Sequence, residues 1–289
     1  YELSLQEDVI LVTLGDMIKV PGSRGSLQNA RSQGADVRFV YSPMECIKIA
    51  SENPNKTVVF FAIGFETTTP MTCALMEQVI KQDIKNILFS INHITVPEVM
   101  RVLVEDKNCK IDAFLGPSHV SVISGSKIYE EFPLSYNKPV VVSGFEPVDV
   151  MQSISMIVKQ FKEKRSDLEI EYKRLVSYEG NLKAQELINR YFKKVPFKFR
   201  GIGEVENSGY ELKDEFDKYN AKIVYKDILP TQEVKENKAC KCPEILKGVA
   251  KPTDCKIFGT VCTPTNPIGS CMVSSEGACS AYYKYGNLL

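Results

Sequence analysis

The sequence predicts an α/β protein, and two features of the 289-residue chain carry that prediction. Through the first 150 residues, short runs of β-branched and apolar residues alternate with segments of helical pattern, which is typical of βαβ units and a mostly parallel sheet. The last fifty residues differ, because they hold six of the nine cysteines. We therefore expect an α/β body followed by a small, separate, cysteine-rich domain.

The elements of the α/β part follow one another in a regular order. The expected strands are Asp8–Leu14, Asp36–Tyr41, Thr57–Ile63, Asn86–Ser90 and Pro139–Ser143. The expected helices between them are Pro43–Glu52, Pro70–Asp83 and Pro97–Glu105. Each helix has a proline at its start, where the fixed φ suits the first turn and the missing N–H costs nothing. The pattern leaves the order of the strands in the sheet open.

One motif occurs twice. Val58–Pro70 reads VVFFAIGFETTTP, and Val140–Pro147 reads VVVSGFEP, so each copy is an apolar strand that runs into Gly-Phe-Glu and then a proline. The repeat indicates two similar α/β lobes, which we expect to be Rossmann-like, at residues 1–66 and 67–146. A chance recurrence of a common strand–glycine–helix junction is the alternative. Residues 147–194 are expected to form a helical connection, and residues 195–289 the third domain.

Composition limits the possible functions. The 36 basic residues balance 36 acidic ones, so the surplus of positive charge typical of a nucleic-acid binder is absent. The longest apolar runs are far too short to cross a bilayer. No signal-peptide pattern opens the chain, which favours a cytoplasmic location. In that reducing compartment, cysteines are more often ligands or redox groups than structural disulfides.

The C-terminal cysteines have the spacing of an iron–sulfur site. They are separated by 1, 12, 6, 8 and 7 residues, and neither histidine of the chain lies among them. An all-thiolate site favours zinc or iron–sulfur. The C-x₂₋₄-C knuckles of structural zinc domains are missing, whereas cluster ligands can be spread over wider loops. We therefore expect a [4Fe–4S] cluster, held by four of the six residues Cys240, Cys242, Cys255, Cys262, Cys271 and Cys279.

Two cysteines are then left over. They are either buried bystanders or a dithiol/disulfide that exchanges electrons with the cluster. The C-x-C pair followed by two further pairs resembles the cysteine framework of ferredoxin–thioredoxin reductase, although the later pairs are more widely spaced here. That resemblance implies Cys242 and Cys279 as the redox pair. It implies four cluster ligands, Cys240, Cys255, Cys262 and Cys271.

Both histidines follow predicted strands. His93 and His119 are expected on loops at the carboxyl edge of a parallel sheet, where open α/β folds bind their ligands. Glu66 and Glu146 hold equivalent places in the repeated motif, and Thr67 follows the first of them. The alternatives are structural histidines and carboxylates that cap helix N-termini.

Longer motifs resemble the HypD family of [NiFe]-hydrogenase maturation proteins. The matching segments are LGDMIKVPGS at Leu14–Ser23, GFETTTP at Gly64–Pro70, NHITVPEV at Asn92–Val99, GPSHVSVISG at Gly116–Gly125, SGFEPVDV at Ser143–Val150, RGIGEVENSG at Arg200–Gly209, and the cysteine block from Cys240 to Tyr285. They extend over essentially the whole chain.

The resemblance implies a function. HypD-like proteins have two α/β lobes and a [4Fe–4S] domain, and they form a scaffold with a HypC-like chaperone. A HypE-like partner donates cyanide to iron on this scaffold, and the unit carrying CN and CO ligands passes to the hydrogenase large subunit. The expected cofactor-binding residues are Glu66, Thr67, His93, His119 and Glu146. A thiol–disulfide oxidoreductase and an interaction protein with a structural zinc domain are the competing functions.

Two departures from the family pattern stand out. A Cys-Gly-x-His-Thr motif and a Gly-Pro-Gly-Cys-Pro-x-Cys motif, both near the family's N-terminus, have no match here, so we expect the chain to begin downstream of both. Ser118 stands where the family usually has glycine in Gly-Pro-Gly-His, which narrows the backbone conformations open to the loop before His119.

Overall fold

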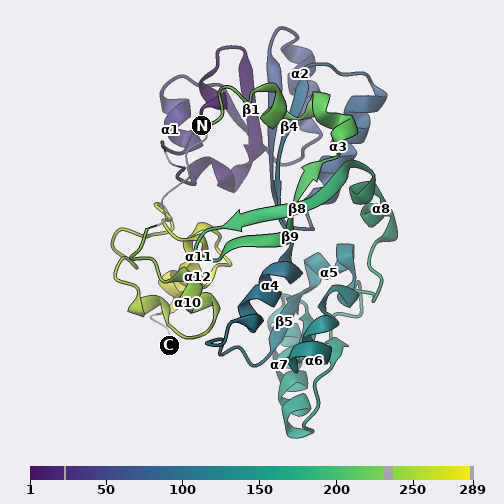
Figure 1. Cartoon of the computed structure of the whole chain (residues 1–289), viewed down its shortest axis with the longest axis vertical. Coiled ribbons are helices and arrows are strands. Elements are labelled where there is room, and N and C mark those ends of the chain that lie inside the picture. The colour runs from purple at the N-terminus through teal and green to yellow at the C-terminus, as the bar shows by residue number, and fades with distance from the viewer. Residues whose placement is uncertain (23, 231–236, 287–289) are drawn as a thin grey trace.

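The computed structural model describes residues 1–22, 24–230 and 237–286. These residues form two separate parallel sheets, one antiparallel hairpin and a C-terminal region of short helices (Figure 1). The prediction of an α/β fold with parallel sheets is confirmed. Within the described chain, no helix combines the length and apolar character that crossing a membrane requires.

The first sheet has four parallel strands in the order β2-β1-β3-β4. Its strands are β1 Val9–Leu14, β2 Val37–Val40, β3 Thr57–Gly64 and β4 Ile87–His93, and the helices between them are α1 Leu27–Ser32, α2 Glu45–Glu52 and α3 Thr69–Lys81. Strand β1 is buried along most of its length and β3 along half of it, which explains their nearly continuous apolar sequence. Their side chains and those of α3 form the main core.

The second sheet has three parallel strands in the order β5-β6-β7. Its strands are β5 Phe114–Pro117, β6 Val140–Ser143 and β7 Leu168–Ile170. Helix α4 (Val96–Glu105) leads to it from the first sheet, and the remaining helices of this part are α5 Ser118–Ser124, α6 Glu131–Tyr136 and α7 Pro147–Lys162. Tyr129, Phe132 and the β6 valines are its core.

A long hairpin lies between the two sheets (Figure 1). Helix α8 (Leu182–Tyr191) leads into β8 (Phe192–Phe199), which pairs antiparallel with β9 (Gly203–Leu212). The hairpin touches the start of α4, because the Thr95 amide donates to the Ser208 carbonyl over 2.9 Å. The hairpin therefore fixes the place where the chain leaves the first sheet for the second.

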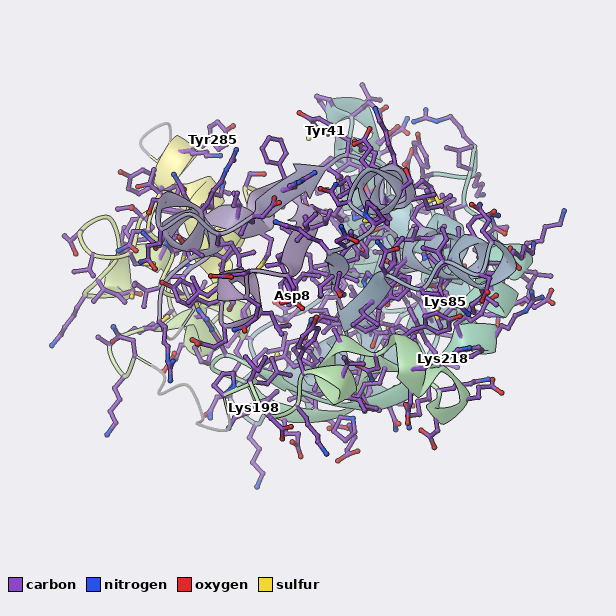
Figure 2. All side chains as sticks on the ribbon, turned by 90° about the horizontal axis from the view of Figure 1, so that it is seen from above. Asp8, Tyr41, Lys85, Lys198, Lys218 and Tyr285 are labelled. Atoms are coloured by element: carbon purple, nitrogen blue, oxygen red, sulfur yellow. The ribbon has the colours of Figure 1, made fainter. Side chains whose placement is uncertain are left out.

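The cysteine-rich region packs beside the hairpin and the first sheet (Figure 1). Viewed from above, it forms one side of the molecule, with Tyr285 at its outer edge (Figure 2). Its helices are short: α10 Cys242–Leu246, α11 Ser270–Val273 and α12 Ala278–Tyr285, preceded by α9 Ala221–Val224. Along the whole described chain, short 3₁₀ helices occur at Leu3–Leu5, Gly15–Lys19, Ser126–Tyr129, Asp214–Tyr219 and Pro252–Asp254.

The five expected strands and three expected helices of the first 150 residues all occur, with ends shifted by a few residues. Strands β5, β7, β8 and β9 were not expected. The placement of both histidines on loops is wrong, because His93 is the last residue of β4 and His119 lies in the first turn of α5.

The structure also locates the expected domain boundaries among the elements. The expected boundary at residues 66/67 falls between β3 and α3, inside the run of elements that builds the first sheet. Residues 147–194 hold α7 and α8, but β7 lies between them. The division into residues 1–66, 67–146, 147–194 and 195–289 stays a prediction.

Candidate functional site

Three cysteine sulfurs meet in the C-terminal region. The Sγ atoms of Cys242, Cys271 and Cys279 lie within 4.8 Å of one another, and all three residues are buried. They come from the starts of three short helices, α10, α11 and α12. The Cys271 amide also donates to the Cys242 sulfur over 3.4 Å. We call these three residues the thiol triad, and their arrangement could hold a metal ion.

Two further cysteines of the block, Cys240 and Cys262, pack in the same cluster as the triad. Cys255 and Cys262 are buried, and Cys240 is half-buried. The Cys255 thiol lies 3.5 Å from the Ala239 carbonyl, and the Ile268 amide donates to the Cys262 sulfur over 3.4 Å. All six thiols are free. Five of the six cysteines of the block therefore lie in one cluster, and the four predicted cluster ligands stay a prediction.

A glycine makes room for two of these thiols. A Cβ at Gly269 would lie 2.5 Å from both the Cys240 sulfur and the Cys242 sulfur, closer than atoms can approach. The φ of Gly269 is −95°, so glycine is needed here for space and not for backbone conformation. The backbone thus leaves a space at the thiols that any other residue would fill.

The triad thiols are held in their neutral form by their surroundings. The pKa of Cys271 is raised to about 12, first by the hydrogen bond with Cys242 and then by burial. For Cys279 the hydrogen bond with Cys242 lowers the pKa, but Cys271 and burial raise it to about 12. A buried thiolate is costly unless a cation compensates it. An iron–sulfur cluster or a metal ion supplies that compensation, so the donor set fits such a group.

One side of the site is open. A cavity of about 510 Å³ lies between the β8–β9 turn and the cysteine-rich region. Its wall includes Cys240, Gly269, Pro243 and Arg200. Cys240 thus contacts the cluster of thiols on one side and lines the cavity on the other.

Glu66 is buried at the carboxyl edge of the first sheet. It follows β3, and only 4% of it is exposed. Its Oε1 accepts from the Val96 amide over 2.9 Å, so it caps α4 and not the helix that follows it in sequence. Its Oε2 is buried and has no hydrogen-bond partner among the described residues. Burial raises the pKa of Glu66 to about 7, against the smaller opposing effect of the Val96 amide.

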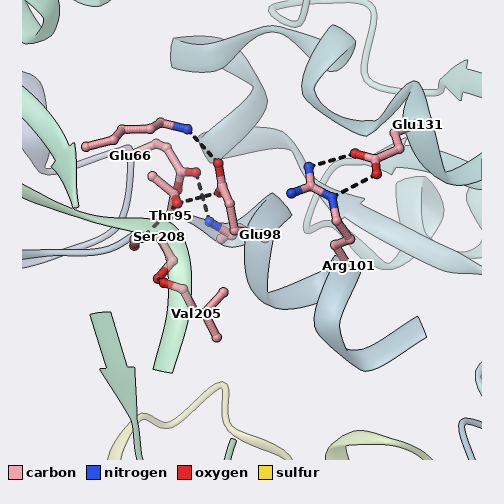
Figure 3. A network of polar contacts seen from close by, with 9 residues as sticks. Glu66, Thr95, Glu98, Arg101, Glu131, Val205 and Ser208 are labelled. Atoms are coloured by element: carbon pink, nitrogen blue, oxygen red, sulfur yellow. Dashed lines mark hydrogen bonds and ion pairs between the residues drawn. The ribbon is translucent and has the colours of Figure 1, made fainter. Parts of the chain in front are cut away.

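A second buried carboxylate lies next to it (Figure 3). Glu98 accepts from the Thr95 hydroxyl over 2.5 Å and from the Lys194 ammonium over 2.5 Å. In the same network Arg101 donates two hydrogen bonds to Glu131 of α6, over 2.8 and 2.7 Å. Thr95, Glu98, Arg101 and Lys194 border a cavity of about 280 Å³ that Glu66 also lines. The cavity is polar and lies where α4, α8 and the hairpin meet.

His93 is a neutral imidazole inside the first sheet. It is fully buried, and its Nε2 lies 2.8 Å from the Thr72 hydroxyl. Its Nδ1 has no partner among the described residues. Burial lowers the pKa of His93 to about 4. At neutral pH, His93 therefore offers a lone pair or an N–H without carrying charge.

The second sheet presents its candidates differently. His119 is exposed at the start of α5, and its ring stacks on Phe145 with centroids 5.0 Å apart. Glu146 is the N-cap residue of α7 but makes no capping hydrogen bond. Its carboxylate lies 3.6 Å from Arg174. The two copies of the Gly-Phe-Glu motif thus end in different environments, one buried and one exposed.

The structure therefore gathers the predicted residues into separate groups. Glu66 and His93 lie at the first sheet, with half-buried Thr67 beside them in sequence, and His119 and Glu146 lie at the second. Among the described residues, no hydrogen bond joins these two groups. The charge of Glu66 nevertheless contributes, less than burial does, to raising the pKa of Tyr129 in the second core.

Sequence reasoning missed Glu98 and Lys194. Thr95 and Glu98 have the S/T-x-x-E spacing of a capping box, which was the available signal. No sequence signal marked Lys194, because its partner Glu98 is 96 residues away.

Together, the fold and the site define an α/β protein with a C-terminal all-thiolate centre able to hold a metal. Comparison with known proteins narrows this class. The model of the HypD family, described as "Hydrogenase formation hypA family", matches residues 1–286. The chain belongs to the HypD family.

Several relatives are similar over nearly the whole chain. Hydrogenase maturation factor HypD2 of Bradyrhizobium diazoefficiens is 47% identical, over 98% of this chain and 76% of its own length. Hydrogenase maturation factor HypD of Azotobacter vinelandii is 45% identical, over 99% and 76%. The HypD of Escherichia coli is 41% identical, over 98% and 76%. The chain thus spans about three quarters of the length of these relatives.

Proposed function

We propose that this protein is a hydrogenase maturation factor that acts as an assembly scaffold. In this role it binds a HypC-like chaperone and a HypE-like cyanide donor while iron acquires its CN and CO ligands, and the unit then passes to the hydrogenase large subunit. The observation that carries the proposal is the thiol triad, in a chain that belongs to the HypD family. A cytoplasmic location fits the nine free cysteines.

The resident cofactor is proposed to be a [4Fe–4S] cluster beside a redox-active dithiol. Its ligands would be Cys240, Cys255, Cys262 and Cys271, and when bound it would supply one-electron transfer. Cys242 and Cys279 would form the dithiol, whose oxidation to a disulfide releases two electrons and two protons. The short distance between their sulfurs supports this pairing, but the Cys271 sulfur lies within the same 4.8 Å of both, so the assignment needs a test that separates the two.

The iron undergoing assembly is proposed to be handled at the edges of the two sheets. Two parallel sheets with their own cores support the idea of two Rossmann-like lobes with this site between them. The proposed residues are Glu66, Thr67, His93, His119 and Glu146. Glu66 and His93 each keep an unpartnered polar atom in the buried part of this site, which a ligand could satisfy.

Cysteine variants test the cluster and the dithiol. We expect Cys255→Ala and Cys262→Ala to lose the cluster, because a methyl group cannot ligate iron. We expect Cys279→Ala to keep the cluster absorbance but to lose the reversible two-electron thiol oxidation, measured by alkylation of free thiols at controlled potential. If Cys242→Ala loses the cluster and Cys240→Ala keeps it, then Cys242 is the cluster ligand and Cys240 belongs to the dithiol.

A thiol–disulfide oxidoreductase is the second candidate, and the closeness of the Cys242 and Cys279 sulfurs favours it. One pair of assays separates the two functions. Co-purification with a HypC-like chaperone, carrying iron with cyanide bands in the infrared spectrum, supports the scaffold. Reduction of a model protein disulfide at a rate that depends on Cys242, without chaperone binding, would replace the scaffold by the oxidoreductase.

A further inference from the structure

The three parallel strands of the second sheet each bring one polar side chain to the same edge. His119 comes shortly after the end of β5, Glu146 shortly after β6, and Arg174 shortly after β7. Because the strands are parallel and adjacent, their carboxyl ends meet at one edge, which is where open α/β folds bind ligands. His119 and Glu146 already belong to the proposed site. Arg174 is a third polar group at the same edge, and the proposed site gives it no role.

A buried carboxylate anchors Arg174. Asp149 is only 3% exposed, and its Oδ1 and Oδ2 accept hydrogen bonds from Nη2 of Arg174 over 3.0 and 2.8 Å. The guanidinium also lies over the ring of Tyr172, with Cζ 4.3 Å from the ring centroid. An ion pair with a buried carboxylate and a contact with an aromatic face together fix the orientation of the planar group. Arg174 is therefore held in place although its side chain is largely exposed.

The glycine of the second Gly-Phe-Glu motif makes room for this anchor. A Cβ at Gly144 would lie 2.1 Å from Oδ2 of Asp149 and 2.5 Å from the ring of Tyr172, closer than atoms can approach. Any other residue here would displace both side chains that hold Arg174. The motif thus supplies Glu146 directly and fixes the place of Arg174 indirectly.

The anchor uses only part of the hydrogen-bonding capacity of Arg174. A guanidinium carries five N–H groups, and both hydrogen bonds to Asp149 come from Nη2. The Glu146 carboxylate lies 3.6 Å from the same nitrogen, which is too long for a hydrogen bond. The N–H groups of Nε and Nη1 take no part in this anchor, so they can donate to a ligand at the edge of the sheet.

The chemistry of the proposed iron unit calls for such a donor. A carboxylate or an imidazole can ligate iron, but a guanidinium has only donors and cannot. Cyanide bound to iron carries negative charge, and the lone pair of its outward-facing nitrogen accepts hydrogen bonds, whereas bound CO is a poor acceptor. A hydrogen bond between a cation and an anionic acceptor is stronger than one between neutral groups. An arginine at this edge therefore favours cyanide over CO.

We propose that Arg174 binds the cyanide ligands of the iron unit through hydrogen bonds from its guanidinium, and that Asp149 positions it. This inference rests on the proposed function and adds to it the residue that recognises cyanide. Arg174 lies outside the motifs that carry the family resemblance. It follows β7, a strand of three residues that has no sequence pattern of its own.

Infrared spectra of the complex with a HypC-like chaperone, made in cells that also contain a HypE-like cyanide donor, test the proposal. We expect Arg174→Met to shift the cyanide bands, because their nitrogen loses a hydrogen bond, and to lower the content of the iron unit roughly tenfold or more. The CO band should move less. Arg174→Lys keeps a cationic donor, so its bands and iron content should lie between those of the parent and Arg174→Met.

Arg165→Met is the matched control. Arg165 lies before β7, at the opposite end of the same strand, and pairs with the exposed carboxylates of Glu163 and Asp167. Its loss should leave the cyanide bands and the iron content as they are in the parent. An equal band shift in Arg165→Met would overturn the assignment to Arg174.

A double variant separates cyanide binding from folding. Arg174→Met alone leaves the buried Asp149 carboxylate without its cation, which destabilises the protein. Asp149→Asn combined with Arg174→Met removes both charges, and circular dichroism checks that it is folded. Its cyanide bands should match those of Arg174→Met, because Asp149 acts through Arg174. Asp149→Asn alone should shift the bands in the same direction.

Two results would overturn the inference, and they are distinguishable. Cyanide bands at the parent frequencies, with full iron content, in the folded double variant would overturn the role of Arg174 and leave the scaffold function standing. A parent complex that carries no cyanide bands, with both partner proteins present, would overturn the scaffold function and the inference with it.

Discussion

Glu66 combines burial, an unpartnered oxygen and a raised pKa in one side chain. Its pKa is raised by burial from 4.5 to about 7, so between these values the native protein holds a proton that the unfolded chain has released. The free energy of unfolding therefore falls as pH rises through this window. We expect Glu66→Gln to escape that loss and to gain about 2–3 kcal/mol relative to the parent between about pH 5 and pH 8.

Urea unfolding of both proteins at several pH values measures this difference. The comparison with the parent matters because His93 acts in the opposite sense. Its pKa is lowered from 6.5 to about 4, so its contribution to stability rises with pH through that range. Glu146→Gln is the matched control, since its carboxylate is exposed. Equal pH dependence in the parent and in Glu66→Gln would contradict the burial of a protonated Glu66.

Gly269 is a second position where a single added carbon should change the protein. A methyl group there would overlap the sulfurs of Cys240 and Cys242, so we expect Gly269→Ala to displace both thiols and to cost about 1–3 kcal/mol of unfolding free energy. Iron content should fall in parallel. Gly15→Ala is the control, because no atom lies within 4 Å of its added Cβ. Full iron content and stability in Gly269→Ala would mean that the thiols lie elsewhere.

At the scale of elements, the sequence pattern predicted those strands whose residues are buried in a continuous run. Strands β1 and β4 are buried along most of their length and β3 along half of it, and all three have clear apolar runs. Strands β5 and β7 have only four and three residues, too few for a periodic signal. In β8, exposed lysines and Pro196 interrupt the alternation of apolar and polar residues that would predict a half-buried strand. Long-range contacts, and not local pattern, define the β8–β9 hairpin.

The hairpin is tied to α4 through a buried charge. Lys194 of β8 donates to Glu98, whose side chain is only 9% exposed. We expect Lys194→Met to destabilise the protein by about 1–3 kcal/mol, because the Glu98 carboxylate loses its cationic partner. The urea midpoint reports this change. Lys193→Met is the matched control, since Lys193 pairs with an exposed Asp214 and its loss should leave the midpoint nearly unchanged. Equal midpoints for both variants would contradict the role of the Lys194–Glu98 pair.

At the scale of the whole molecule, the α/β class and the cysteine-rich region could be predicted because each rests on composition along a continuous stretch. Contacts between residues that are far apart in the sequence could not be predicted in this way. Glu66 caps α4, thirty residues away, and the thiol triad draws its sulfurs from three separate helices. The spacing of the cysteines predicted a thiolate site, but it could not predict that Cys242, Cys271 and Cys279 would be the three whose sulfurs lie within 4.8 Å of one another.

The central claim is that the C-terminal thiols hold iron and sulfide. Metal and acid-labile sulfide analysis of anaerobically purified protein tests it most directly. We predict a brown protein with about four iron and about four sulfide per chain and little zinc. A colourless, fully folded anaerobic sample that contains stoichiometric zinc and no sulfide would contradict the claim.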